Sequence, residues 1–206
     1  NWLPANIVRG EGIFIKFNDE VLRRWAERED VKAHFVRLSK AYENSWFGSR
    51  ADRRPVTPTF VAIHTLSHLL VNKLCFNCGY GSSSLRERIY CNLFNEKEVM
   101  NGLLIYTASG DSEGSLGGLV KQGNPGYLDQ ILIEAIEDAK WCSADPVCST
   151  VGVQNGQGPE NINGAACHNC SLIPETSCEE FNLLLDRTFL IGKLDNPDIG
   201  LFSEPI

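Results

Sequence analysis

The sequence predicts an α+β domain in which helices pack on a small mixed sheet and a zinc knuckle lies between two helices. Three observations support this prediction. Short β-prone runs occur at 11–17 and 102–108, and apolar residues recur at helical spacing over 59–74. Five of the eight cysteines fall within 142–178. At 206 residues the chain is long enough for one large domain with a hydrophobic core.

Composition excludes several classes of protein. Hydrophobic residues make up 43% of the chain and charged residues 22%, as in ordinary globular proteins. No apolar run approaches the roughly 18 to 20 residues of a membrane span, so we expect no membrane contact. The net charge of −7 argues against a self-sufficient nucleic-acid binder, because phosphate contact needs a basic face. The chain starts at Asn1 and has one methionine, Met100, so we expect it to be a piece of a longer protein.

Two segments are predicted. Residues 1–57 carry a strand, two helices and a polar linker, and residues 58–206 carry the domain that contains the knuckle. The linker contains a basic patch of Arg50, Arg53 and Arg54. We expect a solvated loop there, and contact with phosphate or an acidic partner is the alternative.

The strongest predicted helix, residues 59–74, carries His64 and His68 one turn apart on one side. This spacing occurs in HExxH metallohydrolases, but Thr65 stands where those enzymes have a glutamate. We therefore expect two buried histidines that are hydrogen-bonded into the core. A role in an interface or polar binding site and metal ligation are the alternatives.

The next segments allow more than one interpretation. Cys75 and Cys78 form a CxxC pair at the end of this helix, where they act as small apolar side chains or as further zinc ligands. Ser84 and Glu87 fit a capping box, although Arg88-Ile-Tyr-Cys91 could equally be a strand. The buried strand 102–108 leads into a glycine-rich polar loop.

That loop supports a rival function from another class. Asp111 and Glu113 in the loop could join His64 and His68 in a metal-dependent hydrolase or nuclease. No nucleophile stands beside the two carboxylates in sequence. The rival requires all four side chains to converge in one cleft.

The cysteine cluster predicts one structural zinc ion. Cys167 and Cys170 have the CxxC spacing that binds a tetrahedral ion, and we expect Cys148 and Cys178 to complete the site. Cys142, at the end of the helix that begins after Asn124-Pro125, is the alternative ligand. Cys178 is expected in the first turn of a helix that runs to about residue 190.

A metal site of this kind indicates a reducing, cytoplasmic location, and disulfides in a secreted protein are the alternative. A tetrahedral site built from four cysteines has no open ligand position, so the zinc is expected to be structural rather than catalytic. We therefore predict that the chain is not an enzyme.

Four stretches resemble the MrfA zinc-binding (MZB) domain, found at the C-terminus of certain DNA helicases and in helicase-associated proteins. They are His64-Thr-Leu-Ser-His-Leu-Leu70, Ser84-Leu-Arg-Glu-Arg-Ile-Tyr90, Leu104-Ile-Tyr-Thr-Ala-Ser109 with Gly117-Gly118, and residues 141–187. The most specific run is Asn163-Gly-Ala-Ala-Cys-His-Asn-Cys-Ser-Leu-Ile-Pro-Glu-Thr-Ser-Cys178. The resemblance covers roughly residues 58–192.

The resemblance carries implications beyond those of the residues alone. It implies a four-cysteine zinc site. The family also includes a component of the DISARM anti-phage system of bacteria, and resemblance to that component implies a non-motor subunit. Such a subunit pairs with a helicase partner and helps to engage invading DNA. The chain has no Walker A sequence and no helicase motifs, so ATPase activity does not carry over.

Overall fold

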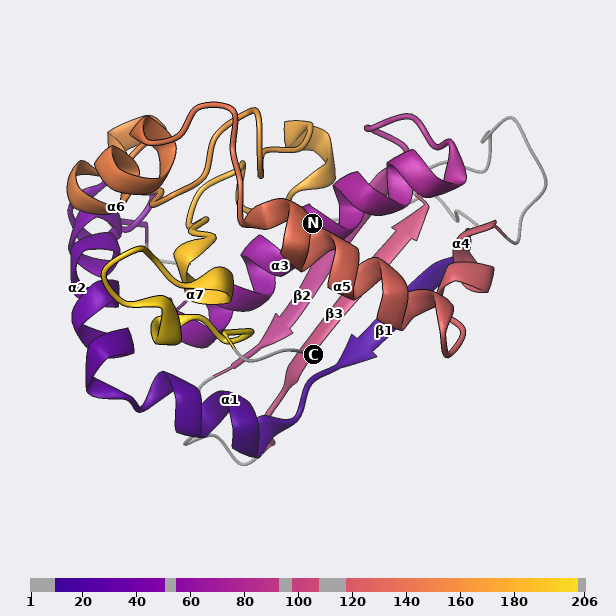
Figure 1. Ribbon diagram of the computed structural model, residues 1–206, viewed down its shortest axis with the longest axis horizontal. Coiled ribbons are helices and arrows are strands. Elements are labelled where there is room, and N and C mark those ends of the chain that lie inside the picture. Colours follow the sequence, from indigo (N-terminus) through magenta and orange to yellow (C-terminus); the bar gives the residue numbers. More distant parts are fainter. Residues whose placement is uncertain (1–9, 51–54, 93–97, 108–117, 204–206) are drawn as a thin grey trace, which may run out of the picture.

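The computed structural model describes residues 10–50, 55–92, 98–107 and 118–203. These residues form a three-stranded sheet covered by helices on one face (Figure 1). The helices and strands, in chain order, are β1 Gly12–Lys16, α1 Asp19–Ala26, α2 Glu29–Asn44, α3 Pro58–Cys78, β2 Leu85–Cys91, β3 Asn101–Thr107, α4 Gly118–Gln122, α5 Tyr127–Ala139, α6 Gly152–Asn155 and α7 Thr188–Ile191. A π-helical turn at Val147–Val151 and 3-10 turns at Pro159–Asn161, Glu175–Ser177 and Pro197–Ile199 complete the described elements.

The sheet has the order β1-β3-β2, and both outer strands run antiparallel to β3. The predicted α+β class is confirmed, although the sheet is antiparallel throughout rather than mixed. Alternate residues face the helices, with Ile13 and Glu87 opposite Ile105 in the register. Because β1 lies in the same sheet as β2 and β3, the N-terminal segment contributes an edge strand to the rest of the fold.

Helix α3 is the centre of the core and contacts β2, β3, α5 and α7. Its start is fixed by Thr57, whose Oγ1 accepts the backbone N–H of Phe60 at 3.1 Å, and by Pro58 in the first turn. It ends at Gly79, which has the left-handed φ of 73° that favours glycine. Among the described residues, α3 is the one helix long and apolar enough to cross a membrane, but 78% of its apolar window is buried inside this protein. It is therefore a core helix.

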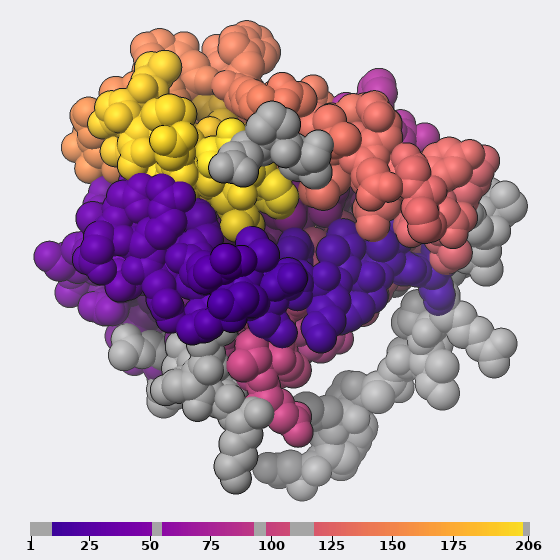
Figure 2. Space-filling model, turned by 60° about the horizontal axis from the view of Figure 1, so that its bottom comes forward, coloured from indigo at the N-terminus to yellow at the C-terminus, as the bar shows by residue number. Residues whose placement is uncertain are grey.

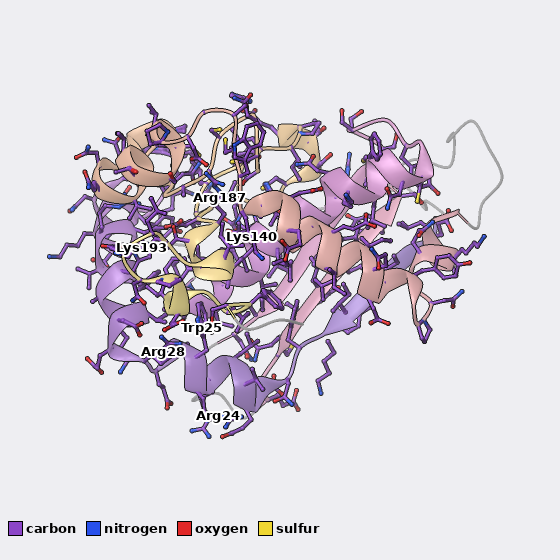
Figure 3. All side chains as sticks on the ribbon, viewed as in Figure 1. Arg24, Trp25, Arg28, Lys140, Arg187 and Lys193 are labelled. Atoms are coloured by element: carbon purple, nitrogen blue, oxygen red, sulfur yellow. The ribbon has the colours of Figure 1, made fainter. Side chains whose placement is uncertain are left out.

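The C-terminal segment fills the space between the N-terminal helices and α5 (Figure 2). Trp25 and Arg28 connect α1 and the start of α2 to it (Figure 3). The indole Nε1 of Trp25 donates to the carbonyl oxygen of Ile199 at 2.8 Å, and Nη1 of Arg28 donates to that of Asp198 at 2.9 Å. Both ends of the described chain thus stabilise one another around α3.

The prediction that a helix begins at Cys178 is wrong. Cys178 is extended, with φ of −108° and ψ of 134°, and the only helix in the following stretch of the described chain is the short α7. Phe181, Asn182 and Leu184 have positive φ values, which interrupt a right-handed helix. The side chain of Asn182 instead bonds both backbone groups of Ile173, which stabilises the turn.

Candidate metal centres

Two clusters of metal-ligand side chains lie in the described part of the chain. The first consists of Cys142, Cys148, Cys167 and Cys170. Their Sγ atoms are separated by 3.5 Å (Cys142 to Cys167), 3.8 Å (Cys148 to Cys170) and 3.8 Å (Cys167 to Cys170). A zinc–sulfur bond of about 2.3 Å gives a tetrahedron whose edges are about 3.8 Å. The four thiols therefore have the spacing that one tetrahedral zinc ion requires.

Two loop segments, 142–148 and 167–170, bring the four thiols together. Cys142 follows the end of α5, and Cys148 lies in the π-helical turn after it. Cys167 and Cys170 lie in a tight turn whose backbone N–H of Cys170 donates to the carbonyl of Cys167. Between the pairs, Nε2 of Gln157 donates to the carbonyl oxygens of Cys148 (3.1 Å) and Gly164 (2.8 Å) and thereby ties the two segments together.

Hydrogen-bond donors surround the sulfur atoms. The backbone N–H of Cys167 donates to Sγ of Cys170 at 3.3 Å, and the backbone N–H of Ala144 donates to Sγ of Cys142 at 3.4 Å. The hydroxyl of Ser171 donates to Sγ of Cys170 at 3.3 Å. Donors of this kind stabilise thiolates, which are the metal-binding form.

The thiols differ in their ease of deprotonation. The hydrogen bond from Cys148 lowers the pKa of Cys170 to about 5, with Ser171 and the backbone of Cys167 acting in the same direction. The shared bond to Cys170 and burial raise the pKa of Cys148 well above its usual range. Burial raises the pKa of Cys142 to about 11. The thiolate form of Cys170 is thus favoured without a cation. A cation is needed to stabilise all four side chains as thiolates.

Arg187 is buried beside this cluster, near the end of α5 (Figure 3). Its Nη1 donates to the carbonyl oxygen of Ala139 at 2.7 Å, and its Nη2 donates to Oδ1 of Asp145 at 2.6 Å. Asp145 in turn accepts the backbone N–H groups of Cys142 (3.0 Å) and Ser149 (2.9 Å). Arg187 and Asp145 therefore position the loop that carries two of the thiols, and the guanidinium supplies positive charge near them.

The four-thiol cluster differs from the expected ligand set at one position. Cys142, which was the alternative ligand, lies with Cys148, Cys167 and Cys170, whereas Cys178 lies in the second cluster. The physical reason is the extended backbone at Cys178, which directs the thiol toward α3 and not toward the CxxC turn.

The second cluster consists of His64 and His68 from α3, Glu87 from β2 and Cys178. All four are buried. Sγ of Cys178 lies 3.2 Å from Nε2 of His64 and 3.3 Å from Nε2 of His68. Oε1 of Glu87 lies 3.1 Å and 3.4 Å from the same two nitrogens. The prediction that His64 and His68 are buried and hydrogen-bonded in the core is confirmed, and they converge with two partners that we did not expect.

The charges in this cluster depend on one another. Burial lowers the pKa of His64 and of His68, but Glu87 and Cys178 together outweigh burial, so the pKa of both is raised. Burial raises the pKa of Glu87, whereas the two histidines hold it well below its usual range. The pKa of Cys178 is likewise lowered, because the histidines outweigh burial. The site thus favours a carboxylate and a thiolate facing positive charge.

Glu87 was missed because the sequence left a capping box at Ser84 and Glu87 and a strand at 88–91 as open alternatives. In the structure it is the central inward-facing residue of β2, between Leu85 and Ile89. The alternation of Leu85, Glu87 and Ile89 is a period-two pattern that could have revealed it. A carboxylate on the buried face of a strand needs charged or hydrogen-bonding partners, which points to a polar site.

The other predicted residues that the structure describes lie in neither cluster. Arg53, Arg54, Asp111 and Glu113 lie outside the described residues. None of the eight cysteines, all of which lie in the described part of the chain, forms a disulfide. Cys75 and Cys78 lie in the last turn of α3. Their thiols point toward the carbonyl oxygens of Gly81 (3.7 Å) and Gly118 (3.9 Å). The disulfide alternative is therefore not what the structure contains.

Comparison with known proteins adds a family to this geometry. The family model of the MrfA Zn-binding domain matches residues 66–171, a range that contains all four cysteines of the first cluster. The DISARM protein DrmB of Bacillus paralicheniformis (strain ATCC 9945a / NCIMB 11709 / CD-2) is 40% identical over 201 residues, which are 95% of this chain and 34% of that protein. The chain thus spans about a third of the length of this curated relative. Because the family model matches more than half of its residues, the chain belongs to the MrfA Zn-binding domain family.

Proposed function

We propose that the chain is the zinc-stabilised, non-catalytic part of a DrmB-like anti-phage defence protein, in which it docks with a helicase-type partner. The observation that carries this proposal is the set of four thiols at the edge lengths of a zinc–sulfur tetrahedron. The similarity to a DISARM protein over nearly the whole chain supports the defence role. Reduced cysteines and zinc ligation favour a cytoplasmic location.

A structural role follows from the ligand set. Four cysteines occupy all four positions of tetrahedral zinc, so no position is left for a reactive water. The segment from 142 to 178 consists of short turns, and its backbone needs crosslinks to hold one conformation. The rival hydrolase site gains no support, because His64 and His68 are buried away from solvent in α3.

DNA contact is proposed through the complex and not through this chain alone. The net charge of −7 disfavours binding of phosphate by the isolated chain. A helicase-type partner would supply the basic surface and the motor, while this chain would hold the partner in place. The resemblance to helicase-associated proteins is what supports this assignment.

The experiment uses the full-length protein within its complete defence system, expressed in bacteria that are challenged with phage. We expect the double variant Cys167→Ser/Cys170→Ser to lose protection and to stop co-purifying with the helicase-type component. Cys75→Ser is the matched control, since this thiol lies in neither cluster. Full protection and co-purification by the double variant would refute the proposed role of the zinc site.

A second measurement separates docking from direct DNA binding. The isolated chain and the complex are each titrated with duplex and single-stranded DNA at rising salt. We expect binding by the complex, weakening steeply with salt, and none by the isolated chain at low salt. Salt-sensitive binding by the isolated chain would contradict the proposal that a partner supplies the DNA contacts.

A further inference from the structure

The buried cluster of His64, His68, Glu87 and Cys178 is not used by the proposed function. Its donors come from three separate parts of the fold: one face of α3, the centre of β2 and the turn after the 3-10 turn Glu175–Ser177. The four ligand atoms all lie within 4.8 Å of one another. The range matched by the family model includes His68 and Glu87 but neither His64 nor Cys178.

The nitrogen–oxygen separations match those of a metal ligand shell, and the nitrogen–sulfur separations are shorter by about 0.3 to 0.4 Å. Tetrahedral zinc with nitrogen, oxygen and sulfur ligands has edges of about 3.3 Å for nitrogen–oxygen pairs and about 3.6 Å for nitrogen–sulfur pairs. In this cluster the nitrogen–oxygen separations are 3.1 and 3.4 Å, and the nitrogen–sulfur separations are 3.2 and 3.3 Å. We propose that Nε2 of His64, Nε2 of His68, a carboxylate oxygen of Glu87 and Sγ of Cys178 bind a second zinc ion.

The hydrogen bonds of the two histidines to Cys178 do not satisfy every polar atom of the cluster. Oε1 of Glu87 is buried and has no hydrogen bond among the described residues, although it lies beside both imidazole nitrogens. Nδ1 of His68 faces the carbonyl oxygen of Ser171 at 2.9 Å. Because a carbonyl only accepts, Nδ1 carries the proton, and Nε2 of a neutral His68 has its lone pair directed into the cluster.

The sulfur of Cys178 is prepared for the same role. The backbone N–H groups of Glu180 and Asn182 donate to Sγ at 3.4 and 3.3 Å. These bonds stabilise a thiolate and fix its direction. The positive φ values of Phe181, Asn182 and Leu184 curl the backbone of this turn around the sulfur. The turn that replaced the predicted helix is therefore a ligand loop.

Charge balance favours a divalent cation. One carboxylate and one thiolate together carry two negative charges, which Zn²⁺ neutralises while both imidazoles stay neutral. Without a cation, neutral imidazoles would direct their lone pairs at the carboxylate and the thiolate. Protonated imidazoles would instead leave four charges buried together, and both arrangements are costly in the core. Two nitrogens, one oxygen and one sulfur are a mixed set that suits zinc rather than magnesium or calcium, which require oxygen ligands.

The second ion would be structural. All four ligands come from the protein, and the cluster is sealed from solvent, so no substrate has access. The ion would join α3, β2 and the turn at Cys178, none of which the four-thiol site crosslinks to one another. The two sites would therefore hold different sets of segments together.

The test measures zinc in the purified wild-type chain by mass spectrometry and its ligand shell by X-ray absorption at the zinc edge. We expect two zinc ions per chain, as the two clusters predict, and a shell in which five sulfur and three nitrogen or oxygen ligands are shared between them. One ion with a pure sulfur shell would overturn the second site and leave the proposed function intact. One ion with a mixed shell would support the second site and contradict the four-thiol site.

Two variants assign the second ion to these residues. Cys178→Ser and Glu87→Gln each remove a charged ligand with little change in size, and each should retain one zinc with a pure sulfur shell. Cys75→Ser, a thiol on the same helix as the two histidines, is the matched control and should retain both ions. Two ions in folded Cys178→Ser would overturn the proposal. If the variants do not fold, the wild-type count and shell decide.

Discussion

His68 and Ser171 connect the two clusters of metal-ligand side chains. Nδ1 of His68 donates to the carbonyl oxygen of Ser171 at 2.9 Å, and the hydroxyl of Ser171 donates to Sγ of Cys170 at 3.3 Å. A single residue beside the CxxC turn therefore orients a ligand in each cluster. Its backbone serves the buried cluster and its side chain serves the four-thiol cluster, so substitution can separate the two roles.

Ser171→Ala is expected to weaken zinc binding at the four-thiol site about tenfold. This is the usual effect of removing a residue that hydrogen-bonds to a metal ligand. The carbonyl that orients His68 is retained, so the buried cluster should not change. Competition with a chromophoric chelator measures the affinity. Ser143→Ala, at an exposed position in the loop between Cys142 and Cys148, is the control. An unchanged affinity for Ser171→Ala would show that the hydroxyl does not support Cys170.

Arg187→Met is expected to lower the free energy of unfolding by about 3 kcal/mol, because it removes the buried member of the ion pair with Asp145. The carbonyl of Ala139 and the carboxylate of Asp145 would each lose the hydrogen bond that Arg187 donates. Urea denaturation measures the change. Arg24, whose side chain is 69% exposed, is the control, and Arg24→Met should change stability by less than about 0.5 kcal/mol. Equal effects of the two substitutions would contradict this account of Arg187.

Gly164→Ala tests the close packing beneath the CxxC turn. A Cβ at Gly164 would lie 2.0 Å from Oδ2 of Asp186. That carboxylate is buried and accepts Nε2 of His34 and the backbone N–H groups of Ala165 and Thr188. We expect a loss of about 3 kcal/mol in unfolding free energy, since the carboxylate has to move away from its donors.

The control for this substitution is Gly81→Ala, where the nearest atom to a Cβ is Oγ of Ser84 at 3.3 Å. A serine side chain can rotate away, so we expect a change of less than about 1 kcal/mol. A similar loss at both positions would mean that the contact with Asp186 is not the cause.

Tyr80 gives a prediction at high pH. Its hydroxyl donates to Oε1 of Glu11 at 2.5 Å, and burial together with this bond raises the pKa of Tyr80 to about 12. The folded state therefore holds the phenol proton more tightly than the unfolded state, whose pKa is about 10. This contribution to stability is fully present below about pH 10 and is lost as the pH rises through about 12.

Ultraviolet titration of the five tyrosines should show one late ionisation step. The step should be absent in Tyr80→Phe and present in Tyr127→Phe, which changes an exposed residue. A titration curve that Tyr80→Phe does not alter would contradict the raised pKa.

Periodic patterns predicted most of the elements. The apolar run over 59–74 became α3, and the β-prone runs at 11–17 and 102–108 became β1 and β3. These predictions succeed because burial of a helix or strand face leaves a repeat in the sequence. Asn18 caps α1, because its Oδ1 accepts the N–H groups of Glu20 and Val21.

The ligand sets were harder to predict because they depend on tertiary contacts. Cys142 lies 25 residues before Cys167 and Cys178 lies 8 residues after Cys170. Either separation allows a cysteine to fold back to the CxxC turn, so spacing alone does not choose between them. The choice depends on backbone angles after Cys178, which no periodic pattern records. Glu87 was difficult to predict for the same reason. The local sequence also fits a helix cap, and only pairing of β2 with β3 turns this residue toward His64.

The central claim is that Cys142, Cys148, Cys167 and Cys170 hold one zinc ion. An anomalous difference map, collected at the zinc edge from a crystal of the purified chain, tests it most directly. The account predicts a peak at about 2.3 Å from each of the four sulfur atoms. A map without a peak among these four thiols, from a chain folded as described here, would contradict the claim.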